Sequence, residues 1–123
     1  LDPKLRELAM CGVAVLNGAE YEFFHHAPPF IKAGGTEEQV KALRLIGQPS
    51  FPRALFSDVE NDAAELTFQM TRNIQVDSAL MKRLQATLGN TDTVELVTVV
   101  AAYNMVSRFL IALDVNPEEH PPE

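Results

Sequence analysis

The sequence predicts an all-α fold of about six helices, and three observations support this prediction. Thr36-Glu-Glu-Gln39 and Ser57-Asp-Val-Glu60 have the capping pattern that opens a helix. Long apolar segments, above all residues 94–113, run on without turn residues. No stretch alternates apolar and polar residues in the way that half-buried strands do. With 123 residues, the chain is expected to form a single domain, 1–123.

The first helix is predicted over residues 3–16. Pro3 suits its first turn, where a backbone N–H has no helical acceptor, and Asn17-Gly18 provides a break after it. Residues 8–16 are apolar on every face of a helix. An amphipathic helix would show one polar face, so this pattern predicts a helix that is buried on all sides.

The second helix is predicted over residues 19–33, with an apolar face and with Gly34-Gly35 at its end. Pro28 and Pro29 lie inside this segment and remove two backbone donors. We therefore expect either a kink or the start of a new helical turn there.

Three helices are predicted in the middle of the chain. The motif at 36–39 opens a short helix that ends near Ile46, and the motif at 57–60 opens one that runs to about Arg72. Asp77 caps a third helix, which runs to Leu88 and is closed by Gly89-Asn90. The two prolines within residues 48–52 make that segment a loop.

The last helix is predicted over residues 93–113, and the acidic, proline-rich residues 116–123 form a tail. Its apolar stretch approaches the length of a membrane span, yet it contains Glu95 and Arg108. Charges at that depth are costly in lipid. We therefore expect a helix buried between protein surfaces, and no association with a membrane.

Composition restricts the classes of function. The net charge of −7, without any Lys/Arg cluster, argues against nucleic acid and anionic membrane surfaces, which bind basic footprints. Cys11 is the only cysteine, so neither an internal disulfide nor a CxxC motif is possible. A reducing, cytoplasmic location is expected. No signal-peptide pattern occurs in these residues, and because Leu1 is not a natural start we expect the natural chain to begin upstream.

The segment most suited to chemistry is residues 7–26, Glu-Leu-Ala-Met-Cys-Gly-Val-Ala-Val-Leu-Asn-Gly-Ala-Glu-Tyr-Glu-Phe-Phe-His-His. Glu22 and His26 are four residues apart, so on a helix they share one face, and Glu7 stands at the edge of the apolar run. Such a pair can exchange a proton near neutral pH, because burial and a partner's charge both change the pKa of an ionisable group. The structural alternative is an exposed ion pair, which contributes only about 0.3–0.5 kcal/mol.

Four further residues are candidates for binding a substrate: His25, Tyr103, Asn104 and Arg108. His25 points to another face of its helix, where an exposed or interface position is the alternative. Tyr103 and Asn104 lie on the last helix, which is predicted to be buried, so their polar groups need hydrogen-bond partners there, and each is a candidate for lining a pocket. Arg108 suits a carboxylate substrate or a structural salt bridge. Although two carboxylates and a histidine are metal ligands, no HxH or HxxxH pattern accompanies them, so we predict no metal and no cofactor.

Several motifs follow one another along nearly the whole chain. They are residues 7–26, with Glu-Tyr-Glu-Phe-x-His-His as the most specific part, then Ala33-Gly34, Glu37-Glu38-Gln39-Val40, and Glu95-Leu-Val…Tyr103-Asn-Met-Val…Arg108-Phe-Leu…Leu113. In this order they resemble the carboxymuconolactone decarboxylase and alkyl hydroperoxidase D superfamily. The resemblance implies an alkyl hydroperoxidase D-like helical bundle that assembles as a homotrimer or homohexamer, with its site near the subunit interface.

The peroxidase branch of that superfamily has a glutamate, a CxxC motif twelve residues later, and a histidine four residues after the second cysteine. Carried onto this chain, the glutamate is Glu7 and the histidine is His26, whereas the cysteine positions hold Ala19 and Glu22. Peroxide reduction through a dithiol needs an attacking thiolate and a resolving thiol. The resemblance therefore implies a non-peroxidase branch with Glu7, Glu22 and His26 as catalytic residues, in which Glu22 orients His26 and Glu7 lies behind it.

The expected function is a lyase: a cofactor-free decarboxylase, or a related proton-transfer enzyme, acting on a small carboxylated lactone or unsaturated ring compound. Loss of CO2 leaves electron density that a conjugated lactone carbonyl absorbs before carbon is protonated. Isomerisation and elimination need the same groups. The alternatives are a non-catalytic helical oligomer and a redox protein that works with a partner's thiols. The expected partners are a small-molecule substrate and further copies of the chain.

Overall fold

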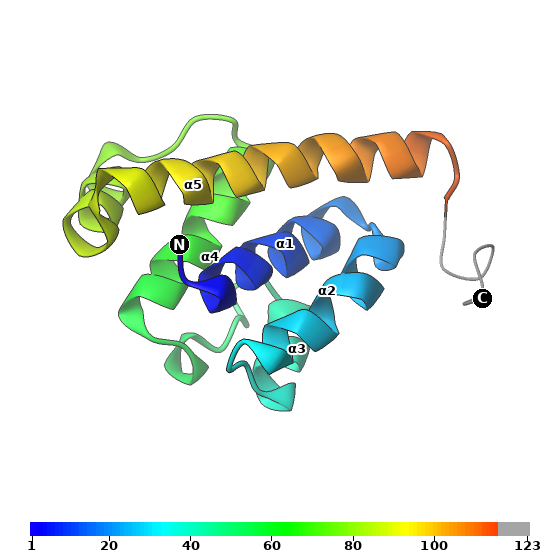
Figure 1. Ribbon diagram of the computed structural model, residues 1–123, viewed down its shortest axis with the longest axis horizontal. Helices are drawn as coiled ribbons and strands as arrows, with labels where there is room; N and C mark the ends of the chain where they lie inside the picture. The colour runs from blue at the N-terminus through cyan, green and yellow to red at the C-terminus, as the bar shows by residue number, and fades with distance from the viewer. Residues whose placement is uncertain (116–123) are drawn as a thin grey trace.

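The computed structural model describes residues 1–115. Within them the chain forms five α-helices and one 3-10 turn, without a strand, so the all-α prediction is confirmed. The elements are α1 (Pro3–Asn17), α2 (Glu20–Lys32), α3 (Glu37–Leu43), η1 (Arg53–Leu55), α4 (Asp58–Arg72) and α5 (Ser78–Ala112), as Figure 1 shows. The predicted tail, 116–123, lies outside the described residues.

α1 lies at the centre of the fold. It packs against α2, α4 and α5, and Figure 1 shows it between α5 on one side and α2 with α3 on the other. Its residues Leu8, Ala9, Cys11 and Val13 have no exposed surface. Because each fully buried leucine or valine contributes about 1.5–3 kcal/mol, this helix is the main stabilising element of the core. The prediction that residues 8–16 are buried is confirmed.

Local capping signals define several helix ends, and both predicted capping boxes are present. Thr36 Oγ1 accepts the Gln39 N–H and Ser57 Oγ accepts the Glu60 N–H, while both third-position side chains accept from the cap backbone. Each box thereby satisfies two donors that the first turn of a helix leaves without partners. Gly18, in the left-handed conformation at φ 68°, ends α1 where the Asn17-Gly18 break is predicted.

No new helix begins at the two prolines of α2. The helix continues through Pro28 and Pro29 to Lys32. The two prolines deprive the carbonyls of Phe24 and His25 of their helical partners. Both of those residues are exposed, so water can take the place of the missing N–H groups.

α5 combines two helices that the sequence predicts to be separate, so the chain has five helices rather than six. Gly89, at φ 81° and ψ 170°, interrupts the helical conformation where the break is predicted, but the helix resumes at the next residue. Figure 1 shows that the first turns of α5 run in a different direction from the rest. A single glycine at positive φ redirects the chain without a loop. Asp77 precedes the helix as predicted, although its side chain makes no capping bond.

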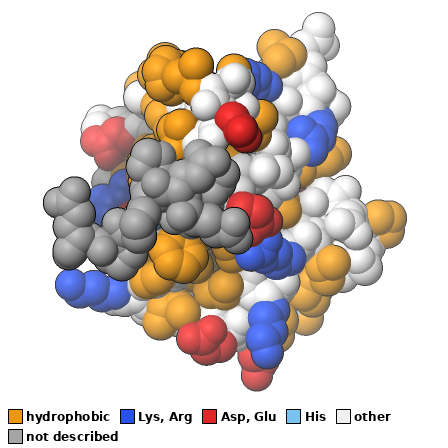
Figure 2. All heavy atoms as spheres, turned by 90° about the vertical axis from the view of Figure 1, so that its right-hand side faces the viewer, with side chains coloured by type: hydrophobic (Ala, Val, Ile, Leu, Met, Phe, Trp, Pro, Cys, Tyr) orange, Lys and Arg blue, Asp and Glu red, His pale blue; other side chains and the backbone are white. Residues whose placement is uncertain are grey.

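The second half of α5 is largely exposed in the single chain. Only three of the residues from 94 to 112 are buried, namely Leu96, Val100 and Ser107. Its exposed apolar side chains are Val94, Met105, Phe109, Ile111 and, just beyond its end, Leu113. Figure 2 looks at the end of the molecule that holds the last turns of α5 and shows hydrophobic side chains gathered on its surface. Length and composition alone would allow α5 to cross a membrane, but one such helix is weak evidence for a span.

Candidate active site

Glu7, Glu22 and His26 come together where α1 packs against α2. Glu7 belongs to α1, while Glu22 and His26 lie one turn apart on α2. The Nδ1 atom of His26 is 2.8 Å from Oε2 of Glu7, at hydrogen-bond geometry. The other ring nitrogen, Nε2, is 3.3 Å from Oε2 of Glu22, within ion-pair distance. Each nitrogen of the imidazole therefore faces a carboxylate.

This acid/base cluster of Glu7, Glu22 and His26 is buried. Glu7 and Glu22 are only 6% and 7% exposed, and the His26 side chain is 17% exposed. A buried carboxylate is costly unless a hydrogen bond or an opposite charge compensates it. Here the imidazole of His26 is the partner of both Glu7 and Glu22. The exposed ion pair that was the structural alternative is not what the structure shows.

The geometry exchanges the roles expected of the two carboxylates, in which Glu22 orients the ring of His26 and Glu7 lies behind it. Glu7, rather than Glu22, makes the hydrogen bond that orients the ring. A carboxylate at Nδ1 favours the tautomer with a proton on that nitrogen, so Nε2 is the ring nitrogen suited to accept or donate a proton. Glu22 lies beside Nε2. Sequence spacing identifies the partner on the same helix but contains no information on how α1 packs against it.

Tyr103 of α5 borders the cluster. Its ring meets His26 edge to face, with the ring centroids 5.0 Å apart and the planes at 89°. Burial raises the pKa of Tyr103, and the charges of Glu22 and Glu7 raise it further. The hydroxyl consequently stays protonated at neutral pH and is available as a hydrogen-bond donor.

Arg6 is a residue of this region that the sequence analysis did not single out. Its Nε is 3.6 Å from Oε1 of Glu7, and its side chain is 43% exposed. Its charge also acts on Tyr103, whose pKa it tends to lower. The sequence shows that Arg6 adjoins Glu7, but consecutive helical residues normally point to different faces, so this contact was not expected.

Asn104 and Arg108 belong to a polar network at the end of α1 rather than to the cluster. Asn104 Oδ1 accepts from Asn17, and its Nδ2 donates to Oγ1 of Thr71, which joins α5 to α1 and α4. Arg108 donates to the backbone and side-chain oxygens of Asn104 one turn before it. Among residues 1–115, Arg108 forms no salt bridge and does not contact His26.

His25 faces solvent. Its ring contacts those of Tyr21 and Phe24, at centroid distances of 4.5 and 5.5 Å. It lines a surface hollow of about 450 Å³ together with Phe23 and Arg44. The sequence correctly separated His25 from the face of Glu22 and His26, and the contacts described here give it no place beside the cluster.

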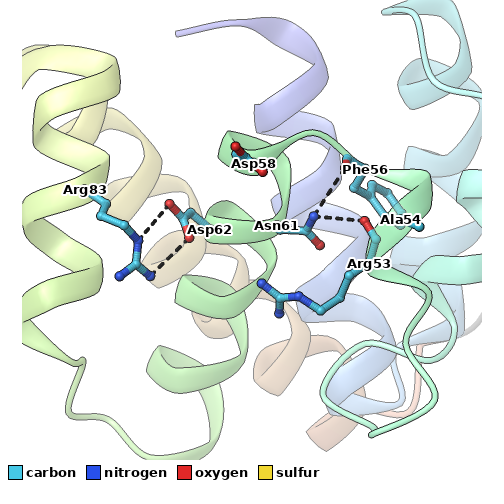
Figure 3. A pocket seen from close by; sticks show the side chains of 7 residues that line it. All are labelled: Arg53, Ala54, Phe56, Asp58, Asn61, Asp62 and Arg83. Atoms are coloured by element: carbon cyan, nitrogen blue, oxygen red, sulfur yellow. Dashed lines mark hydrogen bonds and ion pairs between the residues drawn. The ribbon is translucent and has the colours of Figure 1, made fainter.

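A larger hollow, of about 570 Å³, opens between η1, the start of α4 and α5. Arg83 and Asp62 form an ion pair at its wall, and Asn61 Nδ2 donates to the carbonyls of Arg53 and Phe56, as Figure 3 shows. Within residues 1–115, Asn61 Oδ1 is the one buried side-chain oxygen or nitrogen without a hydrogen-bond partner. None of the cluster residues lines this hollow, so its size does not make it the reactive site.

No metal arrangement is found in the part of the chain that the structure describes: no three His, Cys, Asp or Glu side chains there are placed to hold an ion. In the cluster itself, both ring nitrogens of His26 already face carboxylate oxygens. The arrangement suits proton transfer through the imidazole, which needs only these side chains.

The pattern of the carboxymuconolactone decarboxylase family matches residues 1–66, just over half of the chain. The chain belongs to this family. The match confirms the resemblance, and the matched residues include all three members of the acid/base cluster. No curated protein and no solved structure matches the chain significantly. Tyr103 and the rest of α5 lie beyond the matched part, so their place at the site rests on the geometry alone.

Cys11 provides a prediction about stability. It is fully buried, and this burial raises the pKa of its thiol to about 12, with a smaller contribution from the charge of Glu7. In the unfolded chain the thiol ionises near pH 9, its ordinary value. Its contribution to stability is therefore complete below about pH 9 and is lost as the pH rises towards 12. The free energy of unfolding should fall more steeply above pH 9 in the parent than in Cys11→Ala. Urea denaturation of both proteins measures the free energy of unfolding at each pH in this range. An equal fall with pH in the parent and in Cys11→Ala would contradict the raised pKa of Cys11.

Proposed function

We propose that the protein is a cofactor-free decarboxylase, or a related proton-transfer enzyme, for a small carboxylated lactone or unsaturated ring compound. The observation that carries the proposal is the buried His26, hydrogen-bonded at Nδ1 to Glu7 and adjoining Glu22 at Nε2. Membership of a family named for a decarboxylase supports it. Proton transfer by a positioned side chain of this kind commonly accelerates a reaction by about 10²–10⁴-fold.

The proposed reaction replaces a carboxylate by hydrogen. The bond between a ring carbon and the carboxylate breaks, CO2 leaves, and the electron pair remains on the ring. A conjugated lactone carbonyl takes up this charge as a dienolate. Protonated His26 then delivers its Nε2 proton to carbon, and Glu7 stabilises the imidazolium before the transfer. A proton from solvent restores the imidazolium, so the sum is carboxylate plus proton giving product plus CO2.

The proposal is tested with unsaturated five-membered lactones that carry a carboxylate on the ring carbon beside the ring oxygen, with and without a second carboxylate on a side arm. The expected result is enzyme-dependent CO2 release and one equivalent of furanone, without added metal or nucleotide. Release no faster than in buffer across these lactones would contradict a decarboxylase function.

We also propose that the chain assembles as a homotrimer or a homohexamer built from trimers. The support is the exposed apolar surface of α5, because large apolar patches on a soluble protein mark interfaces. Sedimentation should show a trimer or hexamer, and Met105→Glu or Phe109→Glu should shift it towards smaller species. A stable monomer of the parent at micromolar concentration would be inconsistent with this assembly.

A redox function with a partner's thiols has less support. Cys11 is the only cysteine, it has no exposed surface, and its raised pKa keeps the thiol neutral at pH 7. Thiol–disulfide exchange requires an accessible thiolate.

A further inference from the structure

We propose that the hollow of about 570 Å³ between η1, α4 and α5 is a second binding site, and that it takes an α-amino acid in its zwitterionic form. Its volume lies in the range of about 300–1,000 Å³ in which small-molecule sites fall. No residue of the His26 cluster lines it, so the site is separate from the proposed reaction. The inference rests on three polar side chains of its lining, those of Asn61, Arg53 and Asp58.

The side-chain amide of Asn61 is held in one orientation. Its Nδ2 donates to the carbonyls of Arg53, Phe56 and Ser57, at 3.0, 3.3 and 3.1 Å. Exchanging the two ends of the amide would set an oxygen against three carbonyl oxygens. Oδ1 is therefore left without a donor among residues 1–115, although Asn61 is only 8% exposed. A buried acceptor without a partner is destabilising, so a ligand that brings an N–H group to it is favoured.

Arg53 supplies a positive charge to the same hollow. Its side chain is exposed and forms no hydrogen bond or ion pair within the described part of the chain. In Figure 3 the oxygen of Asn61 points towards the side chain of Arg53. Exposed side chains change rotamer rapidly, so Arg53 can turn to admit a ligand to this oxygen. Its guanidinium presents a planar fork of N–H groups that pairs with both oxygens of a carboxylate.

Asp58 supplies the opposite charge. Its carboxylate is exposed and, within residues 1–115, has no hydrogen-bond or ion-pair partner. Figure 3 shows it on the other side of Asn61 from the guanidinium of Arg53. The two remaining charges of the lining, Arg83 and Asp62, are paired with each other at 3.2 Å. The hollow thus offers a ligand one unpaired cation, one unpaired anion and one buried acceptor.

A ligand with both charges matches this arrangement, whereas a ligand with one charge does not. A simple anion would pair with Arg53 but would meet the carboxylate of Asp58 and the oxygen of Asn61. A simple amine would pair with Asp58 but would meet the charge of Arg53. An α-amino acid brings a carboxylate for Arg53 and an ammonium group whose three N–H donors suit Asn61 and Asp58. Ala54 and Phe56 give the hollow apolar surface for a hydrocarbon side chain.

The test is an NMR titration of the nitrogen-15-labelled protein with L-leucine and with L-alanine, a method that detects weak binding. The signals of the Asn61 side-chain amide and of Arg53 Nε should shift saturably with millimolar amino acid. Removing one charge from leucine gives 4-methylpentanoate or 3-methylbutylamine. Each should bind about 10–100-fold more weakly than L-leucine, as expected for the loss of a charge-assisted hydrogen bond.

Two variants assign the two charges. Arg53→Gln should weaken binding of L-leucine by about 10–100-fold and leave that of 3-methylbutylamine no weaker. Asp58→Asn should also weaken binding of L-leucine and leave that of 4-methylpentanoate no weaker. Both side chains are exposed and unpaired, so neither change should affect folding. Arg44→Gln, in the separate hollow beside His25, is the matched control and should bind L-leucine like the parent.

Three results would overturn the inference: no saturable shift with either amino acid, binding of 4-methylpentanoate as tight as that of L-leucine, or an equal loss of L-leucine binding in Arg44→Gln and Arg53→Gln. The second result would indicate a simple anion site. None of the three concerns the proposed decarboxylase function, because that reaction takes place at His26.

Discussion

Replacing His26 by glutamine should lower kcat/KM for decarboxylation by about 10²–10⁴-fold, because the group that delivers the proton is lost. Glutamine is preferred to alanine because its amide still donates to Glu7, which would otherwise be a buried carboxylate without a partner. His26→Ala should show the same loss of activity with some loss of stability. Steady-state kinetics measure the effect, and circular dichroism and sedimentation control for folding and assembly.

A purely structural role for His26 predicts a different outcome. His26→Gln would then retain near-parental rates across the pH range, and only the free energy of unfolding would change. That result would remove the site assignment.

Glu7→Gln should be the second most damaging substitution, with kcat reduced by about 10²–10⁴-fold. The amide removes the negative charge that stabilises the imidazolium, and its N–H permits the tautomer with a bare Nδ1. Glu22→Gln is the matched control, because it changes the same chemical group beside Nε2 and leaves the Glu7 hydrogen bond intact. Glu22→Gln should lower kcat clearly less than Glu7→Gln does.

Nitrogen-15 NMR of the histidine ring separates the two variants. The proton on Nδ1 of His26 should be retained in the parent and in Glu22→Gln, and should be lost or redistributed in Glu7→Gln. A larger loss of activity in Glu22→Gln than in Glu7→Gln would restore the order that the sequence predicts, with Glu22 orienting the ring.

The starts of α3 and α4 and the end of α1 were predictable because they depend on a few neighbouring residues. The capping boxes at Thr36 and Ser57 and the break at Gly18 are set by side chains that bond to their own backbone or by local dihedral angles. The continuity of α5 was not predictable in the same way. Whether Gly89 ends a helix or only redirects it depends on what the following residues pack against, and that is a property of the whole fold.

The candidate site was predictable in part. The spacing of Glu22 and His26 indicates a shared helix face, and the family resemblance adds Glu7. Contacts between helices decide the rest. They place Glu7 on Nδ1, bring Arg6 to the cluster and hold Arg108 on Asn104. No local pattern encodes these contacts.

The stereochemistry of protonation in deuterium oxide tests the central claim, that His26 delivers the proton to carbon. A side chain fixed on one side of the substrate protonates one face, whereas solvent reaches both. The parent should release CO2 from a carboxylated lactone and produce furanone with one deuterium on a single face of a single ring carbon. Furanone labelled equally on both faces, at an undiminished rate, would contradict the claim.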